Sequence, residues 1–223
     1  MGNLKMNNKV LIITGSDGAA AQGLIHYFAD KYEHVIGFSR QQQVSYQQES
    51  VEIMKVDMLH PNQIQNVIDT IIQKHGEING WINCVGGFSM GSLIEDADDW
   101  ESMYSINFIT CLSGCRAILP QLKKQNHGCI INFGSKAALE GFPTAAPYLI
   151  SKSAVHSLTK LISIEMNDSQ ASCNAILPGI IDTPANRVAM PNEDYSTWES
   201  IDDIGSKIND IFKDSISGQL MTL

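Results

Sequence analysis

Short apolar segments alternate with helix-like patterns along this chain, and the alternation limits its fold more than any other feature. Longer helical patterns run from Trp100 to Leu122 and from Thr144 to Met166, and another follows Pro61, a residue suited to a helix's first turn. Such alternation predicts a doubly wound, parallel, Rossmann-type α/β sheet of about seven strands with helices on both faces. We expect a single domain over residues 1–223, with these strands: Val10–Thr14, Val35–Ser39, Val51–Val56, Gly80–Val85, Cys129–Gly134, Ser172–Leu177 and Gln219–Leu223.

The segment from Gln41 to Ser50 departs from this alternation. It is polar, rich in glutamine, and too short for a full crossover helix with its loops. We therefore expect a missing or shortened helix between the second and third strands.

The first predicted strand runs into a glycine-rich turn. Gly15 and Gly18 follow it, and Ala21 takes the place of a third glycine in the spacing G-x-x-G-x-x-A. Such glycines let the chain turn tightly and bring backbone N–H groups near a pyrophosphate at a helix N-terminus. The pattern predicts a dinucleotide site; an ordinary strand-to-helix turn is the alternative.

An acid–base site is predicted by three residues. Tyr148 and Lys152 stand four residues apart in a helical pattern, so they share a helix face. A cation beside the phenol lowers its pKa from near 10 toward the working range. Ser135 follows an apolar run, so its hydroxyl would lie at the carboxyl end of a strand, where α/β sheets bind ligands. The alternatives are that Ser135 is a helix cap, Tyr148 a core aromatic residue and Lys152 a solvated surface charge.

Composition excludes several other classes. Of the 223 residues, 43% are hydrophobic and 17% are charged, enough to build a sizeable core, and the net charge of −9 argues against nucleic acid or an anionic membrane as a partner. We find no signal peptide, no membrane-spanning run and no metal spacing among the histidines. The odd cysteine number without a C-x-x-C pair favours reduced thiols in a cytoplasmic protein. These cysteines are Cys84, Cys111, Cys115, Cys129 and Cys173.

Taken together, these motifs resemble the short-chain dehydrogenase/reductase family over essentially the whole chain. The resemblance implies that Ser135, Tyr148 and Lys152 are catalytic and that Asn107 completes a tetrad by holding a water. It also implies an NAD(P) site along the carboxyl ends of the strands. The implied cofactor-binding residues are Gly15, Ser16, Asp17, Gly18, Ala19, Ala20, Ser39, Arg40, Asp57, Met58, Asn83, Val85, Gly86, Tyr148, Lys152, Pro178, Gly179, Ile181 and Thr183.

Within that family, the chain most resembles quinoid dihydropteridine reductase and its bacterial relatives. The likeness lies in the segments from Thr183 to Trp198 and from Lys136 to Leu139, and in the short link after the second strand. That reductase carries an alanine where this chain has Ser135, and an acid where it has Ser39. Because a quinoid pterin is a conjugated imine, the serine here favours a carbonyl substrate instead. The residues expected to meet the substrate are Gly87, Asn186, Arg187, Met190 and Trp198.

The implied reaction is hydride transfer to a small carbonyl compound. Ser135 would donate a hydrogen bond to the substrate oxygen, Tyr148 would act as general acid or base, and Lys152 would lower the tyrosine's pKa and bind the nicotinamide ribose. Because Ser39 is not an acid and Arg40 is a cation, NADP(H) is favoured over NAD(H), unless Arg40 is merely exposed.

Three hypotheses follow for the function. They are an NADPH-dependent carbonyl reductase, which we favour, a dihydropteridine reductase-like enzyme, and a non-catalytic dinucleotide-binding sensor or scaffold. Both long helical patterns carry more apolar residues than one buried face needs, which predicts a homodimer or homotetramer. The competing explanation is that Ile201–Phe212 covers the surplus within one chain.

Overall fold

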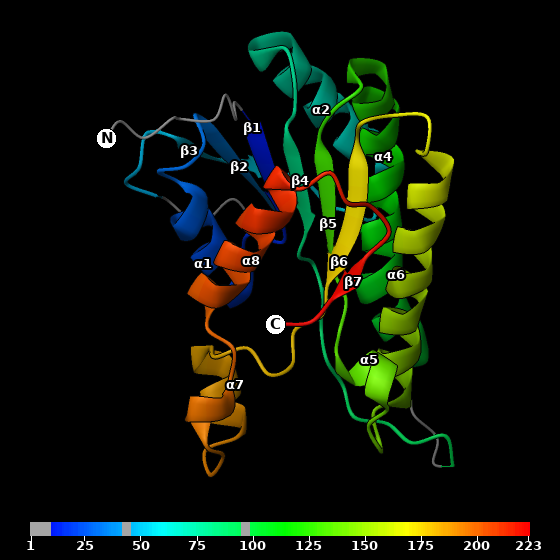
Figure 1. Ribbon diagram of the computed structural model, residues 1–223. Helices are drawn as coiled ribbons and strands as arrows, with labels where there is room; N and C mark the ends of the chain where they lie inside the picture. Colours follow the sequence, from blue (N-terminus) through cyan, green and yellow to red (C-terminus); the bar gives the residue numbers. More distant parts are fainter. Residues whose placement is uncertain (1–9, 42–45, 95–98) are drawn as a thin grey trace.

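Seven parallel strands form one sheet in the part of the chain that the computed structural model describes, residues 10–41, 46–94 and 99–223 (Figure 1). The strand order is β3-β2-β1-β4-β5-β6-β7, and every neighbouring pair is parallel. The predicted α/β fold is therefore confirmed. The strands are β1 (Val10–Thr14), β2 (His34–Ser39), β3 (Val51–Lys55), β4 (Gly80–Asn83), β5 (Cys129–Phe133), β6 (Ser172–Ile176) and β7 (Leu220–Met221).

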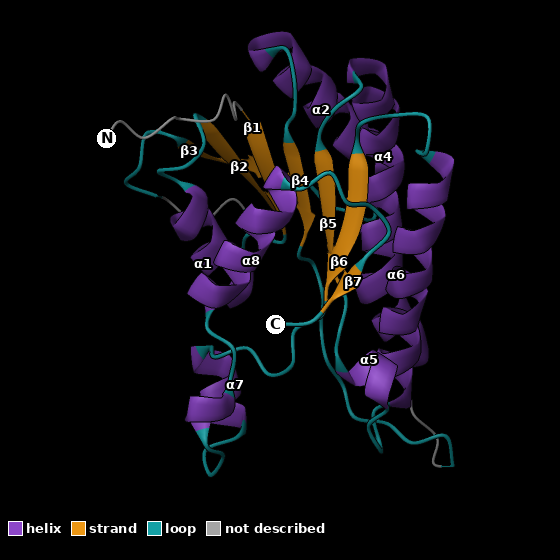
Figure 2. Cartoon of the chain, viewed as in Figure 1, coloured by secondary structure: helices purple, strands orange, loops and turns teal. Residues whose placement is uncertain are grey.

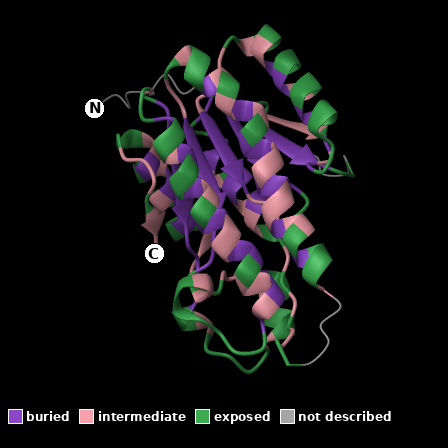
Figure 3. Cartoon of the chain, turned by 90° about the vertical axis from the view of Figure 1, so that its right-hand side faces the viewer, coloured by how far each residue is buried: buried purple, intermediate pink, exposed green. Residues whose placement is uncertain are grey.

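Helices cover both faces of the sheet (Figure 2). Leu11 and Ile13 of β1 belong to the apolar core under one pair of helices, while Val10 and Ile12 belong to the core under the other set. This follows from the alternation of side chains along a strand. The first pair is α1 (Ala19–Phe28) and α8 (Ile201–Lys213), and the other set is α2 (Pro61–His75), α4 (Thr110–Gln125) and α6 (Ala146–Glu165). The strands are buried throughout most of the sheet, and the helices expose their outer faces (Figure 3).

The link between β2 and β3 carries no helix in its described residues, 40–41 and 46–50. These residues agree with the expectation of a missing or shortened helix in this link. Residues 42–45 of the same link lie outside the described part of the chain. Arg40, directly after β2, is exposed, whereas Phe38 and Ser39 at the end of the strand are buried.

The helical pattern from Trp100 is longer and less regular than expected. It comprises α3 (Trp100–Tyr104), a π-helical segment (Ser105–Ile109) and α4, which ends at Gln125. Such a π segment in an α-helix is rare and is frequent at functional sites.

The helix predicted from Thr144 begins two residues later, at Ala146. Thr144 has a φ of 60°, which is a left-handed conformation that cannot begin a right-handed helix. Pro147 then fits the first turn, because the N–H that it lacks has no partner within the helix at that position.

Short helices lie beyond the carboxyl ends of the strands. In Figure 1, α5 (Ala137–Glu140) lies beside the start of α6, and α7 (Pro184–Ala189) lies on the other side of the molecule, below α8. A 3-10 turn, Tyr195–Thr197, follows α7. Both helices therefore flank the edge of the sheet at which the sequence predicts the site.

Candidate active site

The glycine-rich turn leaves β1 at the carboxyl edge and enters α1. Gly15 has a φ of 74°, and a Cβ built there would lie 3.0 Å from Val85 Cγ2 and 3.1 Å from Val85 Cα. A side chain at Gly15 would thus be strained and would collide with the loop after β4. Gly18 caps α1 and donates its N–H to the Gly15 carbonyl at 2.9 Å. The turn has the tight form that approach to a pyrophosphate requires.

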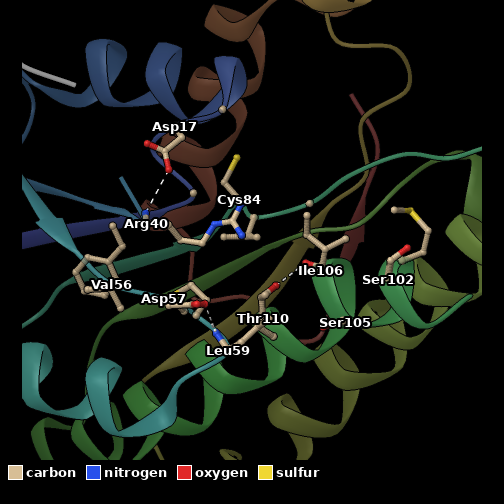
Figure 4. Close-up of a pocket in the computed structure, with 17 residues that line it drawn as sticks. Asp17, Arg40, Val56, Asp57, Leu59, Cys84, Ser102, Ser105, Ile106 and Thr110 are labelled. Atoms are coloured by element: carbon tan, nitrogen blue, oxygen red, sulfur yellow. Dashed lines mark hydrogen bonds between the residues drawn. The ribbon is translucent and has the colours of Figure 1, made fainter. Parts of the chain in front are cut away.

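A cavity of about 400 Å³ opens beside this turn (Figure 4), within the range of roughly 300–1,000 Å³ that small-molecule sites occupy. It follows the carboxyl ends of β1 to β4 and reaches the π-helical segment. The lining includes these residues predicted to bind the cofactor: Gly15, Asp17, Gly18, Arg40, Asp57, Met58, Val85 and Gly86.

Other lining residues were not predicted to bind the cofactor: Phe38, Val56, Leu59, Cys84, Ser102, Met103, Ser105, Ile106 and Thr110. Several come from α3, the π-helical segment and the start of α4. Their helical spacing was visible in the sequence, but nothing there indicated that this helix faces the glycine turn. The cavity combines a glycine-lined wall with apolar side chains, which fits a dinucleotide.

An acidic side chain lies at the end of β2, where the sequence analysis found none. Asp17 Oδ1 accepts a hydrogen bond from Ser39 Oγ at 2.5 Å, and its Oδ2 accepts from the Arg40 N–H at 3.3 Å. The Arg40 side chain extends across the cavity, away from this carboxylate (Figure 4). A carboxylate from the glycine turn and a cation from β2 therefore share one wall of the cavity.

Some predicted cofactor residues lie outside the described lining of the cavity: Ser16, Ala19, Ala20, Ser39, Asn83, Tyr148, Lys152, Pro178, Gly179, Ile181 and Thr183. The Asn83 side chain is buried, donating to Asn132 Oδ1 at 2.8 Å and accepting from Trp81 Nε1 at 2.7 Å. Thr183 caps α7 by accepting the Asn186 N–H at 3.2 Å. Both side chains have clear structural partners.

The predicted acid–base residues lie together. Burial raises the pKa of Tyr148 above its usual 10, and the nearby Ser135 side chain offsets part of this rise. The sequence-based expectation of a lysine-lowered pKa is therefore reversed in direction. A raised pKa leaves the phenol protonated at neutral pH.

Lys152 is buried one helical turn beyond the tyrosine. Its Nζ donates to the Phe133 carbonyl at 2.8 Å, and a Cβ on Gly86 would come within 3.3 Å of it. Burial lowers the pKa of this lysine, an effect opposed by nearby thiols. The ammonium is thus held at the carboxyl end of β5, against the loop after β4.

Asn107 lies in the π-helical segment and fastens that same loop. Its Oδ1 accepts the Gly87 N–H at 2.9 Å, while its Nδ2 donates to the Gly87 carbonyl at 3.0 Å and to Ser151 Oγ at 3.1 Å. The amide of Asn107 therefore joins the β4 loop to α6. Its predicted water-holding role stays a prediction.

One residue beside Ser135 was missed in the sequence. His156 is buried, and its Nε2 accepts the Ser135 N–H at 3.2 Å. Burial, with Lys152 and Lys160, lowers the pKa of His156 to about 4, so the ring is neutral and can accept this bond. A Cβ on Gly134 would strike the same ring at 2.5 Å, so the glycine permits the contact. The sequence did contain a signal for His156, because Tyr148, Lys152 and His156 follow one another at intervals of four residues and so share a helix face.

The segment predicted to meet the substrate folds as α7 and its flanking loops. Arg187 forms a bidentate ion pair with Asp182, with N···O distances of 2.6 and 2.7 Å. Asn186 Nδ2 donates to the Ile181 carbonyl at 2.8 Å. Trp198 is buried, with its ring centroid 4.6 Å from that of Tyr195. Met190 is half-buried.

Two kinds of feature are absent from the described residues, 10–41, 46–94 and 99–223. None of the helices in these residues is both long and apolar enough to span a bilayer. The same residues hold no group of three histidine, cysteine or acidic side chains able to bind a metal ion.

Comparisons with known proteins give consistent matches. A family model described as short chain dehydrogenase matches residues 9–194. Cyclopentanol dehydrogenase of Comamonas testosteroni is 27% identical over 192 residues, covering 81% of this chain and 76% of that protein. The 3beta-hydroxysteroid dehydrogenase of Mediterraneibacter gnavus is 27% identical over 190 residues, covering 81% and 68%. Neither relative is a dihydropteridine reductase, so that likeness stays a prediction.

Solved structures agree in fold. The structure described as ElxO with NADP bound has a TM-score of 0.87 and 23% identity, covering 96% of each chain. The ligand-free aldohexose dehydrogenase of Thermoplasma acidophilum has a TM-score of 0.85 and 22% identity, covering 97% of this chain and 92% of that one. At these identities the likeness concerns the fold alone.

Proposed function

The chain belongs to the short-chain dehydrogenase family and is an NAD(P)-dependent oxidoreductase, and from this premise we propose that it reduces a small carbonyl compound. The observation that carries the proposal is that α6 and the carboxyl end of β5 bring Tyr148 close to Ser135, whose backbone N–H donates to His156 of the same helix. A proton donor and a second hydroxyl beside it are what a carbonyl oxygen needs as it gains negative charge.

Each residue has a distinct task in this proposal. Tyr148, protonated at neutral pH, gives its proton to the substrate oxygen, and Ser135 donates a hydrogen bond to the same oxygen. His156 orients the Ser135 backbone, and Lys152 contributes a positive charge behind the site. When bound, the reduced nicotinamide supplies the hydride that the carbonyl carbon receives.

Alcohol and ketone chemistry also fits the relatives. The matched proteins named above are dehydrogenases of cyclopentanol and of a 3β-hydroxysteroid. Both names describe a secondary alcohol, whose oxidation product is a ketone. We propose the same pair of functional groups, a ketone and its secondary alcohol, for this chain.

NADPH is the proposed cofactor, with Arg40 as its determinant. The Arg40 side chain lines the cavity at the end of β2, where a cation can accommodate a 2′-phosphate. The NADP-bound structure of ElxO supports a cofactor of this type. Asp17 opposes this preference, because its carboxylate would repel a second anion on the same wall.

The proposal also covers the cellular location of the enzyme and the class of its ligands. The described cysteines are all free, and all but Cys84 are buried, which supports a reducing compartment and hence a cytoplasmic location. Small molecules, not nucleic acids or membranes, are the proposed ligands, on the strength of the net charge of −9.

A dihydropteridine reductase-like activity is the second candidate, because β2 and β3 are joined without a helix in the described residues, as the resemblance implied. Turnover of simple ketones and of quinoid dihydropterin, each with NADPH and NADH, separates the two. With Ser135→Ala we expect ketone reduction to fall on the order of 10²–10³ in kcat, as for a lost oxyanion donor, and pterin reduction to change little. Faster turnover of the pterin by the unaltered protein would reject the first candidate; cofactor binding without any turnover would favour a non-catalytic sensor.

A further inference from the structure

Polar side chains near the proposed substrate site are largely engaged with one another. The Arg187 guanidinium is neutralised by Asp182, and their hydrogen bonds lower the pKa of that carboxyl. The Asn186 amide donates to a backbone carbonyl of its own loop. The Arg187 cation, which the sequence led us to expect against the substrate, is therefore already paired, and an anionic substrate would have to compete with Asp182 for it.

Large apolar side chains, by contrast, are exposed around Tyr148. We call Phe88, Met90, Leu139 and Phe142 the apolar rim; their exposed fractions are 59%, 53%, 54% and 48%. The first two follow β4, and the other two lie in and just after α5. Exposed apolar surface that gathers at a site of chemistry commonly marks a binding surface.

Backbone hydrogen bonds hold the rim beside the proton donor. The Gly91 N–H donates to the Thr144 carbonyl at 2.7 Å, and the Ala146 N–H donates to the Gly91 carbonyl at 2.8 Å. The loop after β4 thus lies alongside the residues that lead into α6. Phe88 meets the Tyr148 ring edge to face, with centroids 5.0 Å apart. The rim therefore begins at the residue that would give the proton.

We infer that the apolar rim binds the hydrocarbon body of the substrate, so that the substrate class is an uncharged ketone carrying an alkyl or alicyclic group. This inference rests on the proposed carbonyl reduction. Ser135 and Tyr148 hold the oxygen, and the hydrocarbon lies over Phe88 and its neighbours. The substrate covers apolar surface that water otherwise meets, and this supplies binding energy far from the reacting carbon.

The test uses methyl ketones lengthened from acetone by one methylene group at a time, together with cyclopentanone and cyclohexanone. Pyruvate, which carries a carboxylate in place of one methyl group of acetone, serves as the charged counterpart. We expect kcat/KM to rise about two- to fourfold per added methylene, the upper value corresponding to full burial of each CH₂. Pyruvate should be reduced more slowly than acetone.

Variants then assign the effect to the rim. Leu139→Ser and Phe142→Ser should flatten the increase of kcat/KM with chain length, mainly through KM. Ile164→Ser is the matched control, since Ile164 is 65% exposed but lies sixteen residues beyond Tyr148 on α6, about 24 Å along the helix. It should retain the full increase. Its sedimentation mass is measured together with its kinetics, because a second copy of the chain is predicted to pack on that part of α6.

Two results would overturn the inference while leaving the proposed function intact. One is a kcat/KM that does not depend on chain length, or that is higher for pyruvate. The other is a rim variant that changes the sedimentation mass, because a second copy of the chain would then cover the rim. Absence of turnover with every ketone would instead reject the carbonyl reduction itself, and the inference with it.

Discussion

The pKa of Tyr148 is set mainly by burial and by the nearby Ser135 side chain, not by a neighbouring cation. Burial raises its pKa, and the Ser135 side chain offsets part of this. The phenol is therefore suited to give a proton, and in the reverse direction it has to lose one to act as base.

Replacing the tyrosine tests this role. Tyr148→Phe removes the proton donor but keeps the ring, including its edge-to-face contact with Phe88. We expect kcat to fall by about 10²–10⁴, the usual contribution of general acid–base catalysis, with cofactor affinity nearly unchanged in a fluorescence titration. Retention of more than about a tenth of the wild-type kcat would contradict the assignment.

The pH dependence of the reaction rates should also report the protonation state of Tyr148. Because the pKa of Tyr148 is raised, the protonated form persists through neutral pH. Carbonyl reduction should thus be flat near neutrality and decline only on the alkaline side of the usual phenol pKa, whereas alcohol oxidation should increase with pH. Initial rates in both directions measure this, and a reduction rate that falls between slightly acidic and neutral pH would exclude the phenol as donor.

Cofactor choice depends on two opposing residues. Arg40→Ala should weaken NADPH binding by about 1–3 kcal/mol, the range for hydrogen bonds to charged groups, with little effect on NADH. Asp17→Asn keeps an oxygen for Ser39 but removes the negative charge, so it should strengthen NADPH relative to NADH. Glu33→Gln, an equal charge change just before the amino end of β2, is the control. A wild-type preference for NADH in these titrations would show that the NADPH proposal is wrong.

At the level of elements, α6 presents Tyr148, Lys152 and His156 on one face, because residues four apart are neighbours on a helix. The packing of this face against β5 brings the first two residues to the strand's carboxyl end and the third beneath Ser135. One helix therefore supplies the proton donor, the cation and the support for the second hydroxyl.

The buried histidine makes stability depend on pH. Its pKa is lowered from 6.5 to about 4, so between these values the unfolded chain takes up a proton that the folded protein refuses. His156 thus makes no difference to stability above pH 6.5 and reduces it as the pH falls toward 4. His156→Asn should show a smaller loss of melting temperature between neutral pH and about pH 5. Equal losses in the two proteins would exclude this contribution.

Prediction from the sequence succeeded where local pattern decides the outcome. The strands were found because each is a short apolar run, and Tyr148 and Lys152 because helical spacing alone places them on one face. Asp17 at the end of β2 and the π-helical turn at Asn107 depend on how separate elements pack, which no local pattern records. The start of α6 was misplaced because the left-handed Thr144 is not evident from its residue type.

At the scale of the whole molecule, α8 does not cover the surplus apolar residues of α6. Its buried Ile204, Ile208 and Ile211 belong to the core that α1 shares, on the other face of the sheet. The alternative in which Ile201–Phe212 covers the surplus apolar residues of both long helices within one chain is thus contradicted. One sheet also unites every described strand, which supports the proposal of a single domain over residues 1–223.

A symmetric homo-oligomer remains the prediction for the exposed side of α6. Ile150, Leu161 and Ile164 are 51%, 57% and 65% exposed there, and Tyr104 of α3 is 44% exposed. Such residues need a cover, and a second copy of the chain can supply it. Sedimentation at micromolar concentration should give a dimer or tetramer of the 24.5 kDa chain, and Leu161→Glu should shift the mass downward. A single species at the monomer mass would contradict this.

The π-helical segment has a consequence for the phase of the helix that contains it. Met103, Asn107, Cys111 and Cys115 are all buried and recur every four residues. In an ideal α-helix each step would turn them by about 40°, adding up to about 120° over three steps. The wider turn at Ser105–Ile109 offsets this rotation and keeps the four side chains on the buried side of the helix. Deleting one residue there would restore a regular helix but would rotate everything after it away from its partners, so this helix should tolerate substitutions far better than changes in length.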